Sequence, residues 1–148
     1  MAWLKANPGK ASMGVGGVGS PAQIIGILFQ KETGTRFEFV TYRGGGAPVI
    51  QDLVGGHIDL AIMDASTSLA QLRSGNIKPY AVMAKSRLAI TPEVPTTDEA
   101  GLPGFYASTW NALWVPKRTP DGVITRLNGA EAEAAHVHVR ALLRRPLT

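Results

Sequence analysis

Short apolar runs alternate with stretches of helical period along the chain. Four runs predict strands, at residues 11–15, 37–42, 58–63 and 79–84. Three intervening stretches predict helices, at residues 20–33, 47–54 and 65–74. The run at 58–63 is nearly continuous, which is typical of a parallel strand buried on both faces. The repeated strand–helix order predicts an α/β fold with an open, mainly parallel sheet flanked by helices.

The first long helix has clear boundary signals. Ser20 is a favourable N-cap, Pro21 suits the first helical position, and Gly34 is a stop signal. Ile24 and Phe29 lie on different faces of this helix, so its apolar arc is wide. We therefore expect the helix to be largely covered.

The last third of the chain has a different pattern. Residues 91–104 form a proline-rich connection, in which Thr96 and Glu99 have the spacing of a capping box. Residues 106–115 predict an extended segment, where Trp110 and Trp114 share a face and are expected in a core, with stacking on a ligand as the alternative. A final helix is expected from 116–121 towards Leu143.

Composition narrows the classes of function. The chain has 148 residues, no cysteine and a net charge of +4, so disulfides, thiolate metal sites and cysteine nucleophiles are excluded. Residues 117–148 hold six basic and three acidic residues, whereas residues 1–116 hold nine and eight. No basic stripe interleaved with aromatic residues is present, so we expect no nucleic-acid partner. Residues 1–8 have no apolar core of a signal peptide, and no run is long enough to span a bilayer.

The informative residues follow the first three predicted strands. We call these segments the first loop (16–20), the second loop (42–47) and the third loop (64–68); each leads into a helix. In an open parallel sheet, ligands bind beyond the carboxyl ends of the strands. Helix N-termini offer unpaired N–H groups, and glycine lets a ligand approach the backbone. Converging loops of this kind predict a site for a carboxylate or a phosphate.

A dinucleotide-binding oxidoreductase domain is the alternative. Gly14, Gly16 and Gly19 fit the G-x-G-x-x-G pattern, and Glu38 follows at about the expected distance. The first strand is short, however, and Pro21 starts the helix after the third glycine, which disfavours this interpretation.

Other catalytic signals are weak. His136 and His138 lie two apart on a helix, so their rings diverge and do not favour a shared metal. The chain has no G-x-S-x-G nucleophile motif and no carboxylate pair implied by spacing. We predict no catalytic residue, no metal and no cofactor.

A series of ordered motifs resembles one family, the substrate-binding receptors of tripartite tricarboxylate transporters, also known as Bug-type periplasmic solute-binding proteins. The resemblance covers about residues 4–128, and its motifs lie at 5–10, 16–20, 42–48, 55–59, 74–78, 92–104 and 110–120.

The resemblance implies a periplasmic protein with two α/β lobes, which binds a small carboxylate solute and works with membrane transporter subunits. Residues 1–104 would be the second lobe, and residues 105–148 a return segment towards the first lobe that ends in a helix. The ligand-binding residues it implies are Gly17, Val18, Gly19 and Ser20 in the first loop, Tyr42, Gly45, Gly46 and Ala47 in the second, and Asp64, Ala65 and Ser66 in the third.

The chain also departs from the family pattern. Family members are about twice as long, and the sequence drifts after Asn128, so we expect the chain to be truncated at both ends and to lack one wall of the site. Two alternatives follow: a remnant that binds nothing, and self-association through an exposed cleft face that includes 106–115.

Overall fold

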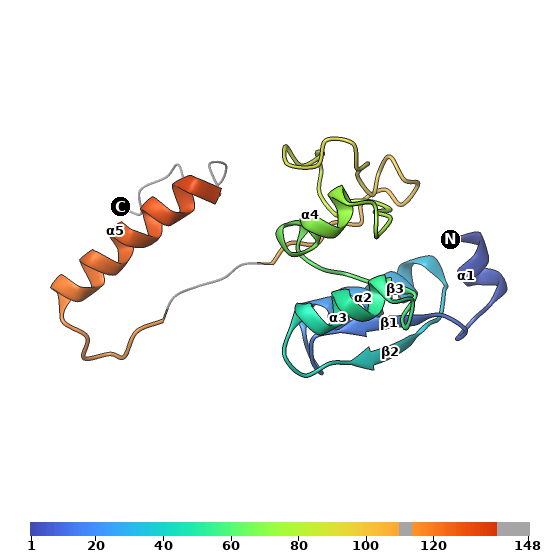
Figure 1. Cartoon of the computed structure of the whole chain (residues 1–148), viewed down its shortest axis with the longest axis horizontal. Helices are drawn as coiled ribbons and strands as arrows, with labels where there is room; N and C mark the ends of the chain where they lie inside the picture. The colour runs from blue at the N-terminus through green and yellow to red at the C-terminus, as the bar shows by residue number, and fades with distance from the viewer. Residues whose placement is uncertain (110–113, 139–148) are drawn as a thin grey trace. The chain divides into compact units, whose positions relative to one another are not determined.

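The computed structural model describes residues 1–109 and 114–138, with the side chains of 131–138 left out. The chain divides into two compact units, Met1–Thr109 and Trp110–Thr148, which we treat separately. The first unit contains α1 (Ala2–Ala6), β1 (Ser12–Val15), α2 (Pro21–Thr33), β2 (Glu38–Thr41), α3 (Gly46–Val54), β3 (Leu60–Ala61) and α4 (Ala65–Arg73) (Figure 1). The second contains α5 (Asp121–His138).

The three strands form one parallel sheet in the order β2-β1-β3. Met13 is in register with Phe39 on one side and Leu60 on the other, and Gly14 pairs with Val40 and Ala61. This arrangement confirms the predicted α/β class and the open, parallel sheet.

The two faces of the sheet are covered by different helices. Met13 faces α2, where a Cβ built on Gly26 would lie 3.0 Å from the Met13 sulfur. Gly14 points to the opposite face, where a built Cβ would lie 2.8 Å from Val49 of α3. The main core lies on the α2 face and consists of Ala11, Met13, Val15 and Phe37, with Leu4, Ala22, Phe29, Phe39, Leu60 and Ile62 packed against it.

Helix α2 begins and ends as the sequence predicts. Ser20 is its N-cap, Pro21 its first residue, and Gly34 its left-handed C-cap at φ 63°. The prediction that this helix is largely covered is wrong, because Ile24, Ile27 and Leu28 are 58%, 53% and 47% exposed. The face of α2 that packs against the sheet and its core carries Ala22, Gly26 and Phe29.

Two predicted strands differ from those observed. The run at 58–63 pairs only through Leu60 and Ala61, both of which are half-buried. Residues 79–84 do not join the sheet; Val82 instead donates its N–H to the Pro95 carbonyl at 2.8 Å and accepts from Thr97 N–H at 2.9 Å. The backbone of Val82 is therefore engaged by the proline-rich segment, with a single parallel bridge to Thr96.

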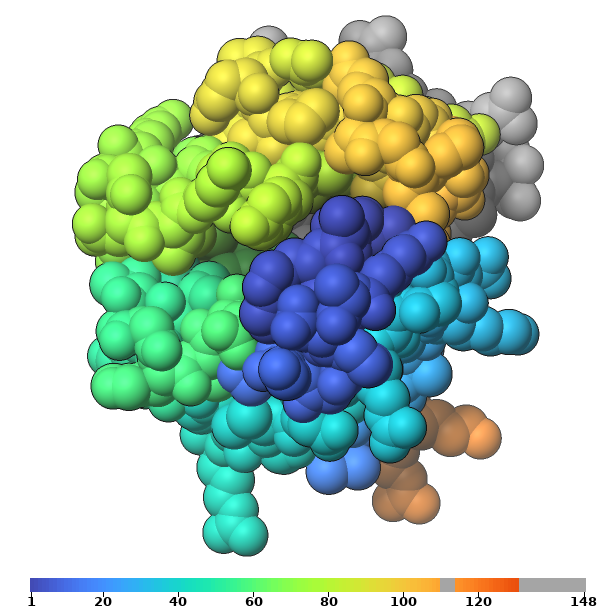
Figure 2. Space-filling model, turned by 90° about the vertical axis from the view of Figure 1, so that its right-hand side faces the viewer, coloured from blue at the N-terminus to red at the C-terminus, as the bar shows by residue number. Residues whose placement is uncertain are grey.

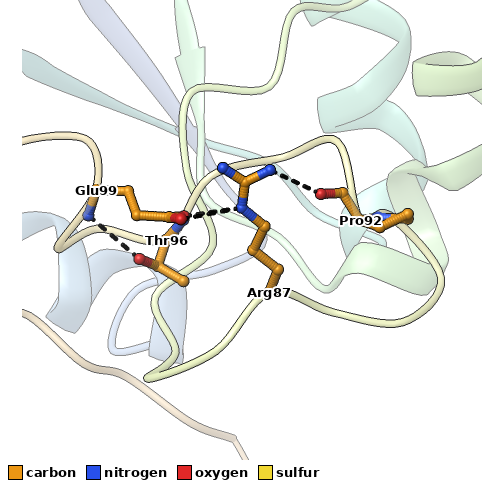
Figure 3. Close-up of polar contacts among 4 residues, drawn as sticks. All are labelled: Arg87, Pro92, Thr96 and Glu99. Atoms are coloured by element: carbon orange, nitrogen blue, oxygen red, sulfur yellow. Dashed lines mark hydrogen bonds and ion pairs between the residues drawn. The ribbon is translucent and has the colours of Figure 1, made fainter.

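The irregular segment after α4 is held together by side chains. Thr96 and Glu99 form the predicted reciprocal bonds, Thr96 N–H to Glu99 at 2.7 Å and Glu99 N–H to the Thr96 hydroxyl at 3.2 Å. Arg87 pairs with Glu99 at 2.9 Å and donates to the Pro92 carbonyl (Figure 3). Phe105 packs this segment against α2, because its ring lies edge-on to the ring of Phe29, with 5.9 Å between the ring centroids.

The N-terminal residues lie at the edge of the sheet where the strands begin. Figure 2 views this side, with α1 in dark blue at its centre. Leu4 packs against the core, and Gly9 N–H donates to the Arg36 carbonyl at 2.9 Å. The short helix α1 was not predicted from the sequence, and it lies away from the carboxyl ends of the strands.

The second unit is described around α5. The predicted final helix is present, and its part beyond His138 lies outside the described residues. The expected extended segment shows no strand at 106–109, and Trp110 lies outside the described residues. Trp114 is 81% exposed, so the prediction that it belongs to a core is wrong. In the described part of the chain, no helix has the length and apolar character of a membrane span.

Candidate functional site

The three predicted loops meet at the carboxyl ends of the parallel strands. A Cβ built on Gly16 would lie 3.4 Å from the backbone of Gly45, so the first and second loops touch. A Cβ built on Gly46 would lie 3.5 Å from Thr67 Cγ2, which joins the second loop to the third. The sheet therefore brings into contact residues that lie 29 and 21 positions apart in the sequence.

The first loop is open but partly hydrogen-bonded within itself. Val18 is 85% exposed, and Gly19 has a left-handed φ of 75° with nothing within 4 Å of a built Cβ. The Gly19 N–H donates to Gln23 Oε1 at 2.7 Å, while Gln23 N–H donates to the Ser20 hydroxyl at 3.4 Å. Gly19 and Ser20 thus have local partners that a ligand would have to complement or replace.

The second loop leads into a helix with open donors at its start. Gly45, the N-cap of α3, provides no side-chain cap and has a φ of 81°, which favours glycine. The first turn of a helix has N–H groups without partners inside the helix, and here Gly46 and Ala47 supply two of them. Both residues are exposed, so these donors can reach a ligand.

Tyr42 lies at the start of the second loop with its hydroxyl directed to α3. Its N–H donates to the Val15 carbonyl at 2.9 Å, and its hydroxyl donates to Asp52 Oδ2 at 2.6 Å. Asp52 Oδ1 also lies 3.4 Å from Nδ1 of His57. The bond from Tyr42, aided by His57, lowers the pKa of Asp52, and the same bond with burial and the carboxylate charge raises the pKa of Tyr42.

The third loop opens α4 in the same way. Asp64 is the N-cap but makes no side-chain cap, and its Oδ1 accepts from the Thr109 hydroxyl at 3.2 Å. Ala65 and Ser66 begin the helix, and Ser66 is exposed. Helix α4 therefore offers N–H groups at the same edge as α3.

The arrangement suits an anion held by backbone donors at an open edge. The positive ends of α2, α3 and α4 all lie at this edge. The described cavities are elsewhere: one of about 280 Å³ is lined by Leu28, Glu32 and 102–106, and the other by side chains of α5. Among the described residues, no cluster of histidine or acidic side chains could hold a metal ion.

The dinucleotide alternative does not fit the structure. Gly14 lies inside β1 and faces Val49 and Ile58, with a built Cβ only 2.5 Å from Ile58 Cδ1, so packing explains its lack of a side chain. Helix α2 begins at Pro21, after Gly19. Glu38 is the first residue of β2, whereas the ribose-binding acid belongs at the carboxyl end of that strand.

Three residues that bond to these loops were not singled out from the sequence. Gln23 donates its N–H to the Ser20 hydroxyl and accepts from Gly19 N–H, one residue before the N-cap, and the capping-box spacing Ser-x-x-Gln could have revealed it. Asp52 accepts a hydrogen bond from the Tyr42 hydroxyl, and the Thr109 hydroxyl donates one to Asp64. The hydrogen bond between Thr109 and Asp64 joins positions 45 residues apart, so no local sequence pattern predicts it.

Comparison with known proteins identifies the family. A family model described as the tripartite tricarboxylate transporter family receptor matches residues 1–143. Protein BugT of Bordetella pertussis is 37% identical over 128 residues, which cover 86% of this chain and 39% of BugT.

Solved structures agree with this match. Rpa4515 of R. palustris with adipate has a TM-score of 0.83 and 31% identity, and the match covers 94% of this chain and 46% of that one. MatC from Rhodopseudomonas palustris with bound malate has a TM-score of 0.78 and 28% identity, and the match covers 90% of this chain and 45% of MatC. The chain spans less than half the length of these relatives. It belongs to the tripartite tricarboxylate transporter receptor family.

Proposed function

We propose that the first unit binds a small carboxylate solute at the three loops, as part of a periplasmic receptor that delivers the solute to membrane transporter subunits. The observation that carries the proposal is the contact between the loops at the carboxyl ends of the strands. Adipate and malate, the compounds bound by two structural neighbours, are both dicarboxylates.

The residues proposed to line the site divide by role. Backbone N–H groups of Gly17, Val18, Gly46, Ala47 and Ala65 bind carboxylate oxygens, and the hydroxyls of Ser20 and Ser66 add further donors. Gly19 and Gly45 give the backbone its left-handed turns. Tyr42 begins the second loop, and Asp64 begins the third. No chemical step is required of any of them, which agrees with a family of receptors.

A charge placed in the first loop tests the proposal. Gly19→Asp puts a carboxylate where the solute carboxylate would lie, and like charges repel, so we expect affinity for malate or adipate to fall about tenfold or more. Isothermal titration calorimetry on the full chain measures the change.

Gly75→Asp is the matched control. Gly75 follows α4 with a φ of 74°, close to the 75° of Gly19, and a built Cβ meets nothing within 4 Å at either position. Both variants therefore incur the same backbone strain, of about 1 kcal/mol. Equal affinity in both variants would contradict binding at the first loop. No heat from the parent chain with any di- or tricarboxylate would contradict the proposal and favour a remnant that binds nothing.

A further inference from the structure

The second loop contains little that fixes its own shape. Gly44, Gly45 and Gly46 are consecutive, and φ is 102° and 81° at the first two. Glycine has the largest backbone freedom of any residue, so a run of three loses the most entropy when it is ordered. The shape of this loop must come from contacts made by residues on either side of it.

Tyr42 and Asp52 provide such a contact across the loop. The bond from the Tyr42 hydroxyl to Asp52 Oδ2, at 2.6 Å, closes a ring of chain that contains all three glycines. The Tyr42 ring lies over Gly14, with its Cε2 3.4 Å from a built Cβ, so the ring is held against β1. The loop is therefore anchored at its start to the sheet.

Asp52 is itself held in place on its other side. Its backbone carbonyl accepts from His57 N–H at 2.8 Å and from Ile58 N–H at 3.4 Å, in the turn that leads to β3. Ile58 is buried and contacts the same Gly14 position. The carboxylate of Asp52 thus occupies a fixed place relative to the sheet.

We propose that Asp52 is a positioning residue of the solute site, which accepts the Tyr42 hydroxyl and thereby fixes the N–H groups at the start of α3. This inference rests on the proposed function. It also changes the role of Tyr42, whose hydroxyl serves the protein and not the solute.

Three variants of the full chain test this inference. Asp52→Ala removes the acceptor, Asp52→Asn keeps an oxygen that can accept from Tyr42, and Asp98→Ala is the matched control. Asp98 accepts from the Tyr106 hydroxyl at the same distance of 2.6 Å but belongs to the proline-rich segment and to none of the three loops. Each variant is titrated calorimetrically with malate and adipate.

We expect Asp52→Ala to weaken binding about tenfold, because a loop that adopts its binding-competent shape about a tenth of the time reduces the apparent affinity by that factor. Asp52→Asn should retain most of the affinity, and Asp98→Ala should bind like the parent. Equal affinity of Asp52→Ala and the parent, or equal weakening by the alanine and asparagine variants, would overturn the inference.

Hydrogen exchange without solute separates this inference from the proposed function. Asp52→Ala should speed amide exchange in peptides that cover 43–50, whereas Asp98→Ala should not. If the parent chain binds no carboxylate, the proposed function fails, and the exchange result still decides whether Asp52 orders the loop. Unchanged exchange at 43–50 in Asp52→Ala would overturn that role.

Discussion

Gly14 shows how a single residue connects packing to the site. It lies two residues before the first loop, and its missing side chain lets Val49 of α3 and Ile58 approach β1. The same close approach brings Tyr42 over the strand. The sequence marks this glycine as part of a cluster, but its packing partners come from 28 to 44 residues away and leave no local signal.

A methyl group at position 14 should therefore destabilise the fold. In Gly14→Ala, the Cβ would lie 2.5 Å from Ile58 and 2.8 Å from Val49, and overpacking of this kind costs about 1–3 kcal/mol. Denaturant unfolding monitored by circular dichroism measures the loss.

Gly46→Ala is the control for this substitution. Its Cβ would lie 3.5 Å from Thr67 Cγ2, an ordinary contact distance. Gly46 is the first residue of α3, and its φ is not positive. We expect stability equal to the parent or slightly higher. A Gly14→Ala protein as stable as Gly46→Ala would contradict the packing of α3 on β1.

At the scale of elements, helix ends were predictable and strand extents were not. Ser20, Pro21 and Gly34 act locally, so the bounds of α2 follow from the sequence. The apolar run at 79–84 has the composition of a strand, but the backbone of Val82 bonds to Pro95 and Thr97. An apolar run shows that a segment is suited to pairing and does not show its partner.

The proline-rich segment gives a prediction about pH. The bond from Arg87, with those from Thr96, lowers the pKa of Glu99 below its ordinary 4.5, and bonds from Tyr106 and Gly104 lower that of Asp98 below 3.8. A carboxyl whose folded-state pKa is lowered stabilises the fold above its ordinary pKa and loses this contribution as pH falls through the folded-state value. The melting temperature should therefore fall between about pH 5 and about pH 3.

Glu99→Gln isolates one part of this effect. Glutamine still accepts from Thr96 N–H, so the cap remains, but it has no carboxyl group to titrate. We expect the variant to melt lower than the parent at neutral pH and to lose less stability on acidification. Parallel melting curves for both proteins across this pH range would contradict the assignment of Glu99.

At the scale of the whole molecule, the sheet, the core and the three loops all belong to the unit Met1–Thr109. The fold class followed from the alternation of strands and helices, as did the edge at which the loops meet. The contacts that shape that edge did not, because pairs such as Asp64 with Thr109 depend on how distant segments pack.

A chain that ends at Thr109 should therefore keep the fold of the first unit. The described core and aromatic contacts lie within residues 1–109, and Thr109 itself bonds to Asp64. We expect its amide NMR spectrum to overlay that of the full chain for residues 1–100. Collapse of the dispersed spectrum would show that the second unit is needed for folding.

Self-association is one of the alternatives that the sequence leaves open, motivated by an apolar strand predicted at 106–115. Residues 106–109 form no strand, which removes part of that motivation. Light scattering of the full chain at micromolar concentration measures the mass, and a dimer that dissociates on addition of malate would link association to the loop edge.

The most direct test of the central claim is an amide NMR titration of the full chain with malate and with adipate. We predict that the largest shifts fall at Gly17, Val18, Gly46, Ala47, Ala65 and Ser66, where donors of the first loop and of the starts of α3 and α4 meet at one edge of the sheet. Shifts concentrated at the groove lined by Leu28 and 102–106, or no shifts with either dicarboxylate, would contradict the account.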